Sequence, residues 1–252
     1  MSTPRPSRSA DRLRRLSFAA IAAALALVQL TGAQSAPTQT TKPMKIGFVG
    51  SGNIGGAIGE LLAKAGHQVF FSSRNPDGLK DLVARVGPRA QAGTPKAAIA
   101  FGDVVFLGVP YNAMPQISRD YAQDLKGKIV LDAGNPNVRR DGAMAEPAIA
   151  KGAGVATAEY LPGARIVRAF NSINYKVFVS EAHRAGEKLA VPLASDDAQA
   201  LAVASQLVID AGFEPVVVGN LAAGKQFDSS TSLFLKALNA RELRQALNLP
   251  AK

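Results

Sequence analysis

The stretch 45-KIGFVGSGNIGG-56 joins an apolar run to closely spaced glycines. The run predicts a buried strand, the glycines a tight turn, and the residues after them the first turn of a helix. In this pattern Gly50 permits the turn, Gly52 lets a pyrophosphate approach the backbone, and Gly55 lets the helix pack closely on the strand. Amide groups at the helix start would then face the phosphates. The residues expected to bind the diphosphate are Gly50, Ser51, Gly52, Asn53, Ile54 and Gly55.

The residues that follow fit the same interpretation. Apolar side chains recur at helical spacing as far as Leu62, Gly66 is a natural helix stop, and Gln68–Phe71 predicts a second strand. The unit from Lys45 to Ser72 has the length of a strand–helix–strand unit, about 30 residues. A glycine-rich helix entry that binds no ligand is the alternative, and the complete unit argues against it.

The end of the second strand predicts which dinucleotide is bound. A site for NAD places an acidic residue there, about 20 residues beyond the glycines, to bond the ribose hydroxyls. Here the chain reads Ser72-Ser73-Arg74, and no carboxylate appears before Asp77. Two hydroxyls and a guanidinium suit a phosphate. The sequence therefore predicts NADP(H) rather than NAD(H), with Arg74 as a solvated loop residue the alternative.

Composition agrees with a folded globular protein, large enough for one sizeable domain or one domain with a small annex. The chain has 252 residues, of which 47% are hydrophobic and 19% charged, an ordinary globular balance. Its net charge is +10; the first 36 residues contribute five arginines and one aspartate, a net of +4, which leaves +6 for the remainder. That moderate excess suits a polyanionic cofactor. No basic run is interleaved with aromatic residues, so we expect no nucleic acid partner.

The front of the chain predicts an export signal. Arginines precede an apolar stretch of about 15 residues, and small residues follow it, which is the three-part plan of a signal peptide over residues 1–36. Arg14-Arg15 resembles a twin-arginine signal. We expect an exported, periplasmic protein, joined to the signal by a linker over 37–44. An uncleaved membrane anchor remains the alternative, although about 20 residues are needed to span a bilayer.

Apolar strands alternate with helices through the rest of the chain, which predicts an α/β fold with a doubly wound parallel sheet of the Rossmann NAD(P)-binding type. We expect this domain over 45–175 and a small C-terminal α/β annex, on the substrate side, over 176–252. Ligands bind at the carboxyl ends of such strands. The loops there supply further candidate cofactor-binding residues: Val109, Pro110, Gly134, Asn135, Pro136 and Asn171. Ordinary turn chemistry also favours these residue types.

Taken together, these motifs resemble those of the coenzyme F420-dependent NADP oxidoreductases, over roughly Lys45 to Leu247. The resemblance rests on the glycine turn with Ser72-Ser73-Arg74, on the loop from Gly134 to Gly142, on Ala169-Phe170-Asn171, and on the stretch 210–221. It implies hydride transfer between NADP and a deazaflavin. It also implies that the nicotinamide lies against Val109, Pro110, Asn135 and Pro136, with the second carrier stacked on it. Membrane ferric reductases have a similar domain that stacks a flavin instead.

Ring-to-ring hydride transfer needs orientation more than acid–base groups, so we expect no catalytic side chain and no metal ligand. The expected partner is a small redox molecule, a deazaflavin or a flavin, with a quinone or a ferric chelate as alternatives. A homodimer stays open. We expect membrane contact only if the signal is not cleaved. Two other functions also stay open. One is another dehydrogenase of the 6-phosphogluconate dehydrogenase and pyrroline-carboxylate reductase superfamily, and the other is a non-catalytic NADP-binding redox module.

Overall fold

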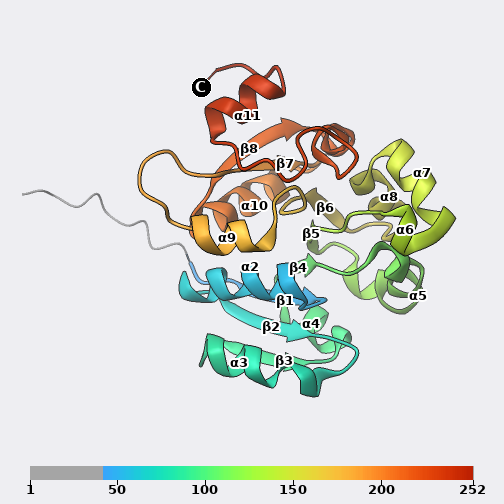
Figure 1. Ribbon diagram of the computed structural model, residues 1–252. Coiled ribbons are helices and arrows are strands. Elements are labelled where there is room, and N and C mark those ends of the chain that lie inside the picture. The colour runs from blue at the N-terminus through green and yellow to red at the C-terminus, as the bar shows by residue number, and fades with distance from the viewer. Residues whose placement is uncertain (1–41, 252) are drawn as a thin grey trace, which may run out of the picture. The chain divides into compact units, whose positions relative to one another are not determined.

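The computed structural model describes residues 42–251, so the predicted signal and most of the predicted linker lie outside the described part. The strands within it are β1 (Lys45–Val49), β2 (Gln68–Ser72), β3 (Ala90–Gly93), β4 (Val104–Leu107), β5 (Ile129–Asp132), β6 (Arg165–Arg168), β7 (Ala190–Ala194) and β8 (Glu214–Gly219). They form one sheet in the order β3-β2-β1-β4-β5-β6-β7-β8 (Figure 1). The first six are parallel, which confirms the predicted sheet.

Helices cover both faces of this sheet. They are α2 (Asn53–Lys64), α3 (Lys80–Val86), α4 (Pro95–Phe101), α5 (Met114–Leu125), α6 (Val138–Asp141), α7 (Ala145–Lys151), α8 (Ala153–Tyr160), α9 (Tyr175–Glu181), α10 (Ala198–Asp210) and α11 (Ala240–Ala246). Short 3₁₀ turns are η1 (Pro76–Leu79), η2 (Tyr111–Ala113), η3 (Gly142–Met144) and η4 (Leu221–Phe227). Helices α6 to α8 fill a stretch without predicted elements.

The apolar core has one layer on each face of the sheet and a third, smaller cluster in the C-terminal annex. One layer packs α2, α3, α9 and α10 against side chains such as Phe48, Phe71 and Phe106. The ring of Phe48 lies 5.3 Å from that of Phe71 and 5.1 Å from that of Phe106, so this layer is continuous across β2, β1 and β4. The other layer packs α4, α5, α7 and α8 against Val105 and Leu107. Strands buried on both faces explain the near-continuous apolar runs in the sequence.

The C-terminal annex joins the same sheet at one point. β7 meets β6 through a single antiparallel pair, Arg168 and Ala194, each the last residue of its strand. β7 and β8 therefore extend past the carboxyl ends of the parallel strands, over the edge where ligands bind in such sheets. The predicted boundary after residue 175 falls within the first turn of α9, and Pro43–Lys252 forms one compact unit.

Within residues 42–251, none of the helices combines the length and hydropathy that crossing a membrane would require.

Candidate functional site

The turn between β1 and α2 has the geometry that the glycine spacing predicts. Gly50 has a φ of +91°, a left-handed conformation that favours glycine, and a β-carbon there would lie 2.6 Å from the Gly108 carbonyl oxygen at the end of β4. Ser51 fixes the turn to β2, because its amide donates to the Ser72 carbonyl (3.1 Å) and its hydroxyl accepts from the Ser72 amide (2.9 Å). The turn is therefore held by both neighbouring strands.

Gly52 and Gly55 differ in the way that a dinucleotide site requires. A β-carbon on Gly52 would meet no atom within 4 Å, whereas one on Gly55 would run into the Gly50 carbonyl oxygen. Gly55 is thus needed for packing, and Gly52 leaves open space at the start of α2. That helix start has neither a side-chain cap nor an acidic residue in its first turn, which includes Asn53 and Ile54. Its amides are available to an anion.

A cavity of about 530 Å³ lies beside this turn, at the carboxyl ends of β1, β2 and β4. It brings together seven of the predicted cofactor-binding residues: Gly50, Ser51, Gly52, Ser73, Arg74, Val109 and Pro110. Asn112 of η2 and Tyr121 of α5 complete its far wall. The size lies within the range of about 300–1,000 Å³ usual for cofactor sites. The glycine turn, Ser73 with Arg74, and two of the four predicted nicotinamide contacts, Val109 and Pro110, therefore share one cavity.

The three residues at the end of β2 have different environments. Ser72 is fully buried, and its hydroxyl donates to the Phe48 carbonyl (2.6 Å), so this side chain faces the interior. The Ser73 hydroxyl donates to the Asn75 carbonyl (2.6 Å) and accepts from its amide (3.0 Å). Arg74 is exposed and forms no hydrogen bond or ion pair with any described residue. Its guanidinium is the group most available for a phosphate.

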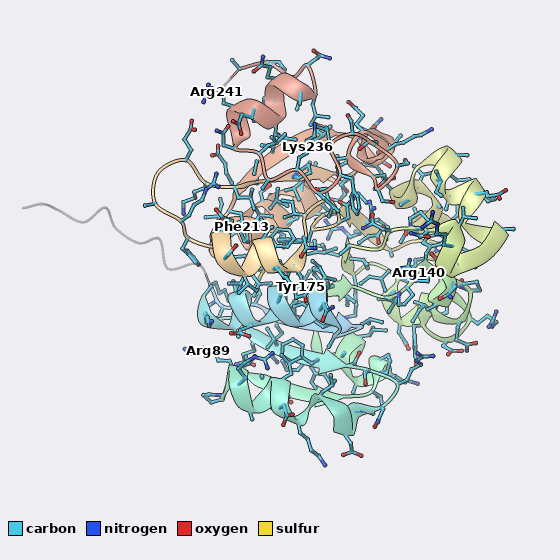
Figure 2. All side chains as sticks on the ribbon, in the orientation of Figure 1. Arg89, Arg140, Tyr175, Phe213, Lys236 and Arg241 are labelled. Atoms are coloured by element: carbon cyan, nitrogen blue, oxygen red, sulfur yellow. The ribbon has the colours of Figure 1, made fainter. Side chains whose placement is uncertain are left out.

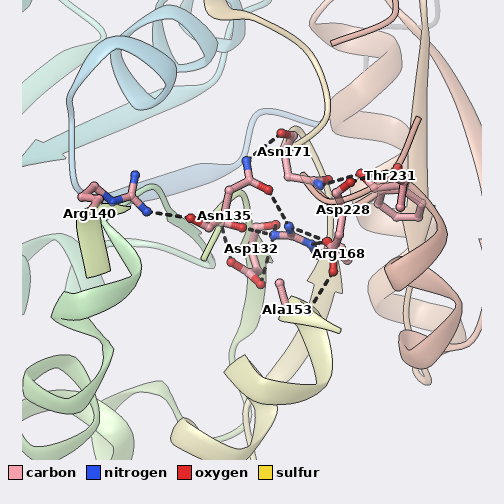
Figure 3. Close-up of polar contacts among 10 residues, drawn as sticks. Asp132, Asn135, Arg140, Ala153, Arg168, Asn171, Asp228 and Thr231 are labelled. Carbon is pink, nitrogen blue, oxygen red and sulfur yellow. Dashed lines mark hydrogen bonds and ion pairs between the residues drawn. The ribbon is translucent and has the colours of Figure 1, made fainter. Parts of the chain in front are cut away.

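The other eight predicted residues do not line this cavity: Asn53, Ile54, Gly55, Ser72, Gly134, Asn135, Pro136 and Asn171. Figure 3 shows the side chains of Asn135 and Asn171 committed to protein contacts. Asn135 Oδ1 accepts from Arg168 (3.0 Å) and its Nδ2 donates to the Asn171 carbonyl (2.8 Å). Asn171 Nδ2 donates to the Phe227 carbonyl (3.1 Å). These bonds hold the loop in shape, and the Asn171 Oδ1 is buried without a hydrogen bond to any residue of 42–251.

Arg168 organises this region, and sequence reasoning missed it as a site residue. Its side chain is fully buried, and it forms ion pairs with Asp228 (2.7 Å) and Asp132 (3.3 Å) (Figure 3). It also donates to the carbonyls of Asp132 (3.1 Å) and Gly134 (2.5 Å). A cation inside a strand predicted to be buried was the available signal, because a buried charge needs partners.

Opposing effects act on the pKa of Asp132 in this network. Burial raises the pKa of Asp132, and Arg168 and the Gly134 amide oppose that rise. Its Oδ1 accepts from the Gly134 amide (2.9 Å), while its Oδ2 approaches Arg168 as an ion pair without hydrogen-bond geometry. Two carboxylates thus share one cation, and the folded state depends on that cation.

Asp141 connects the loop from Gly134 to the cavity. Its carboxylate accepts from the amides of Asn137 (2.8 Å) and Asn112 (3.2 Å), and Asn112 lines the cavity. Burial acts to raise the pKa of Asp141, but the ion pair with Arg140 and these amides outweigh it, so the pKa lies below its ordinary value. Arg140 also donates to the Asn135 carbonyl (2.6 Å). Hydrogen bonds to Asp141 and Arg140 therefore connect the loop that begins at Gly134 to the wall of the cofactor cavity.

Substituting the two glycines separates binding from folding. In Gly52→Ala the new methyl group occupies open space, so we expect the free energy of unfolding to change by less than about 1 kcal/mol. We expect NADPH affinity to fall at least about tenfold, because the methyl group blocks close approach to charged oxygens. Gly55→Ala should instead destabilise the fold by about 1–3 kcal/mol. Thermal unfolding and calorimetric titration measure both; equal affinity of Gly52→Ala and wild type would contradict this role.

Replacing Arg168 leaves two buried carboxylates without their cation. We expect Arg168→Met to lose about 3–5 kcal/mol of stability. Without the cation, the buried carboxyls have a higher pKa in the folded protein than in the unfolded chain. The loss of stability should therefore grow as the pH rises above the unfolded pKa, because the folded protein must then keep a proton that the unfolded chain has released. Arg165→Met is the matched control on the same strand, because its ion pair with Asp197 is partly solvent-exposed and such pairs contribute little to stability. Denaturant unfolding at several pH values measures this, and equal losses would contradict it.

Comparison with known proteins gives one family match and one curated relative. Residues 45–136 match the family model described as NADP oxidoreductase, coenzyme F420-dependent. The metalloreductase STEAP3 of Rattus norvegicus is 26% identical over 192 residues, which cover 73% of this chain and 36% of that protein. The chain thus spans about a third of the length of this curated relative.

Solved structures show the same fold. The hypothetical protein SMa0349 from Sinorhizobium meliloti superposes with a TM-score of 0.67 at 28% identity, over 80% of this chain and 97% of that one. A candidate F420-dependent NADP-reductase from Arthrobacter sp. FB24 gives 0.62 at 24% identity, over 72% and 87%. Over residues 45–136 the chain is thus similar to the coenzyme F420-dependent NADP oxidoreductases, and its fold is that of these two solved structures.

Proposed function

We propose that this NADP-dependent oxidoreductase binds NADPH in the 530 Å³ cavity and reduces a second flat carrier, a deazaflavin such as coenzyme F420 or a flavin. Bound NADPH supplies the hydride, and the protein supplies binding and orientation. The observation that carries this proposal is the order of groups along the cavity. Arg74 follows β2, the glycine turn follows β1, and Val109 and Pro110 follow β4.

Each of these three groups along the cavity suits one part of the dinucleotide. Arg74 offers a planar set of donors to a phosphate on the adenosine ribose. The amides that begin α2 face the diphosphate, where Gly52 leaves room for it. Val109 and Pro110 offer an apolar wall after β4, which follows β2 and β1 in the sheet. Since a dinucleotide crosses such a sheet in an extended form, this wall would hold the nicotinamide.

The chain's contribution to the reaction is to hold two rings in place. Reaction between positioned groups gains mainly from orientation and from exclusion of water, and it loses rate when the geometry loosens. Arg168 and Asp141 hold the loop that begins at Gly134 against the cavity side of η2. This rigid loop, and the annex that overhangs the carboxyl edge, would define where the second carrier lies.

Arg74 is expected to read the extra phosphate. We expect Arg74→Ala to weaken NADPH binding about tenfold, the loss of a charge-assisted contact reduced by exposure, and to leave NADH binding unchanged. Arg89→Ala is the matched control. Arg89 is also exposed, but it lies at the amino end of β3, whereas Arg74 follows the carboxyl end of β2 (Figure 2). Calorimetric titration with both cofactors checks this. An unchanged preference in Arg74→Ala would show that another group reads the phosphate.

Turnover by the purified full chain tests the reaction itself. We expect NADPH oxidation with a deazaflavin or with FMN as acceptor, and little with keto acids or cyclic imines. Oxidation only with keto acids or imines would favour another dehydrogenase of the wider superfamily. Tight NADPH binding with no working acceptor would favour the non-catalytic redox module. Arg89→Ala, which lies outside the cavity, serves as the activity control.

The cellular setting is also a proposal. The export signal predicted over residues 1–36 lies outside the described residues, and a periplasmic location and a homodimer stay predictions with it. A tightly held cofactor would suit such a location, since twin-arginine export moves proteins that have folded around their cofactor.

A further inference from the structure

A second cavity, of about 300 Å³, lies between η2 and the helix pair α7–α8. Figure 1 shows α7 and α8 side by side at the end of the chain's green-to-yellow portion. The second cavity is lined by eight residues: Tyr111, Met144, Pro147, Ala148, Lys151, Ala156, Glu159 and Tyr160. None of these residues lines the cofactor cavity. The two cavities meet at η2, where the neighbours of Tyr111 line the cofactor side.

Tyr111 supplies an unused polar group to this second cavity. The residue is 2% exposed, yet its hydroxyl forms no hydrogen bond with any described residue. Its oxygen is also not among the sealed, unpaired polar atoms of residues 42–251, so it keeps some accessible surface, and the residue lines this cavity. Buried tyrosine hydroxyls normally have a partner. Burial raises the pKa of Tyr111 well above its ordinary value, so the group stays a protonated donor.

The other walls define what shape fits beside that hydroxyl. The ring of Tyr160 stands edge-on to that of Tyr111, with centroids 6.1 Å apart, and Met144, Pro147 and two alanines are apolar. Lys151 and Glu159 form an ion pair (2.7 Å) and are 40% and 57% exposed, so they sit at the rim and neutralise each other. An apolar cavity of about 150 Å³ already holds benzene. This cavity therefore suits one substituted ring and is too small for a dinucleotide.

We propose that this cavity binds a planar, uncharged, single-ring carbonyl compound, whose oxygen accepts a hydrogen bond from the Tyr111 hydroxyl. The ring lies against Tyr160 and Met144, and the carbonyl replaces the partner that the protein does not provide. The site is separate from the cofactor cavity and does not depend on which carrier the enzyme reduces.

The chain offers an unusually clean readout, because it has four tyrosines and no tryptophan. In the full chain with isotope-labelled tyrosine rings, NMR follows each tyrosine separately. Tyr111 and Tyr160 report on this cavity, Tyr121 on the cofactor cavity, and Tyr175 (Figure 2) lines neither. We expect acetophenone to shift Tyr111 and Tyr160, and NADPH to shift Tyr121. If acetophenone shifts Tyr121 alone, or no tyrosine, the proposal is overturned, whatever NADPH does.

Two further comparisons test the hydrogen bond itself. Ethylbenzene has the shape of acetophenone without the carbonyl, and Tyr111→Phe keeps the ring without the hydroxyl. We expect acetophenone to bind about three- to tenfold more weakly to Tyr111→Phe, and ethylbenzene to bind both proteins equally. Tyr175→Phe is the matched control and should change nothing. Ala156→Leu, which fills the cavity, should abolish binding with Tyr111 intact; equal binding of both ligands to wild type would contradict the proposal.

Discussion

The structure depends on a close approach of two backbones at the carboxyl edge of the sheet. Gly50 turns beside the Gly108 carbonyl, in a space that no side chain can enter. That contact fixes where β1 ends, and so it fixes the start of α2 against β4. Because α2 begins there without a cap or an acidic residue, its amides face open space beside Gly52. The binding site is thus a consequence of how three strands end.

A second constraint lies on the other side of that edge. Arg168 is the last residue of β6 and is fully buried. Its guanidinium bonds to the end of β5, to the loop after β5 and to Asp228 of the C-terminal segment. Only one backbone pair joins β6 to β7, so these side-chain bonds reinforce the joint between the parallel sheet and the annex. A buried charge network is weak evidence for stability by itself, but it fixes one arrangement of the loops it touches.

Much of the fold could be predicted, because its signals are local. Apolar runs, helical spacing and glycine stops predict the alternation of strands and helices that builds the parallel sheet, and the glycine turn and Arg74 lie together at one cavity. The Arg168 network could not be predicted, because its partners lie 36 and 60 residues away in the chain. Helices α6 to α8 are short, and α7 and α8 are rich in alanine, so no periodic pattern marks them. The turned-in hydroxyl of Ser72 depends on the register of β1 and β2, which no local pattern reveals.

The most direct test of this account is a crystal structure of the full chain with NADP⁺ bound. The account predicts the diphosphate against the amides of residues 52–55, the ribose phosphate within hydrogen-bond distance of Arg74, and the nicotinamide against Val109 and Pro110. A dinucleotide bound elsewhere, or one whose ribose phosphate points away from Arg74, would contradict it.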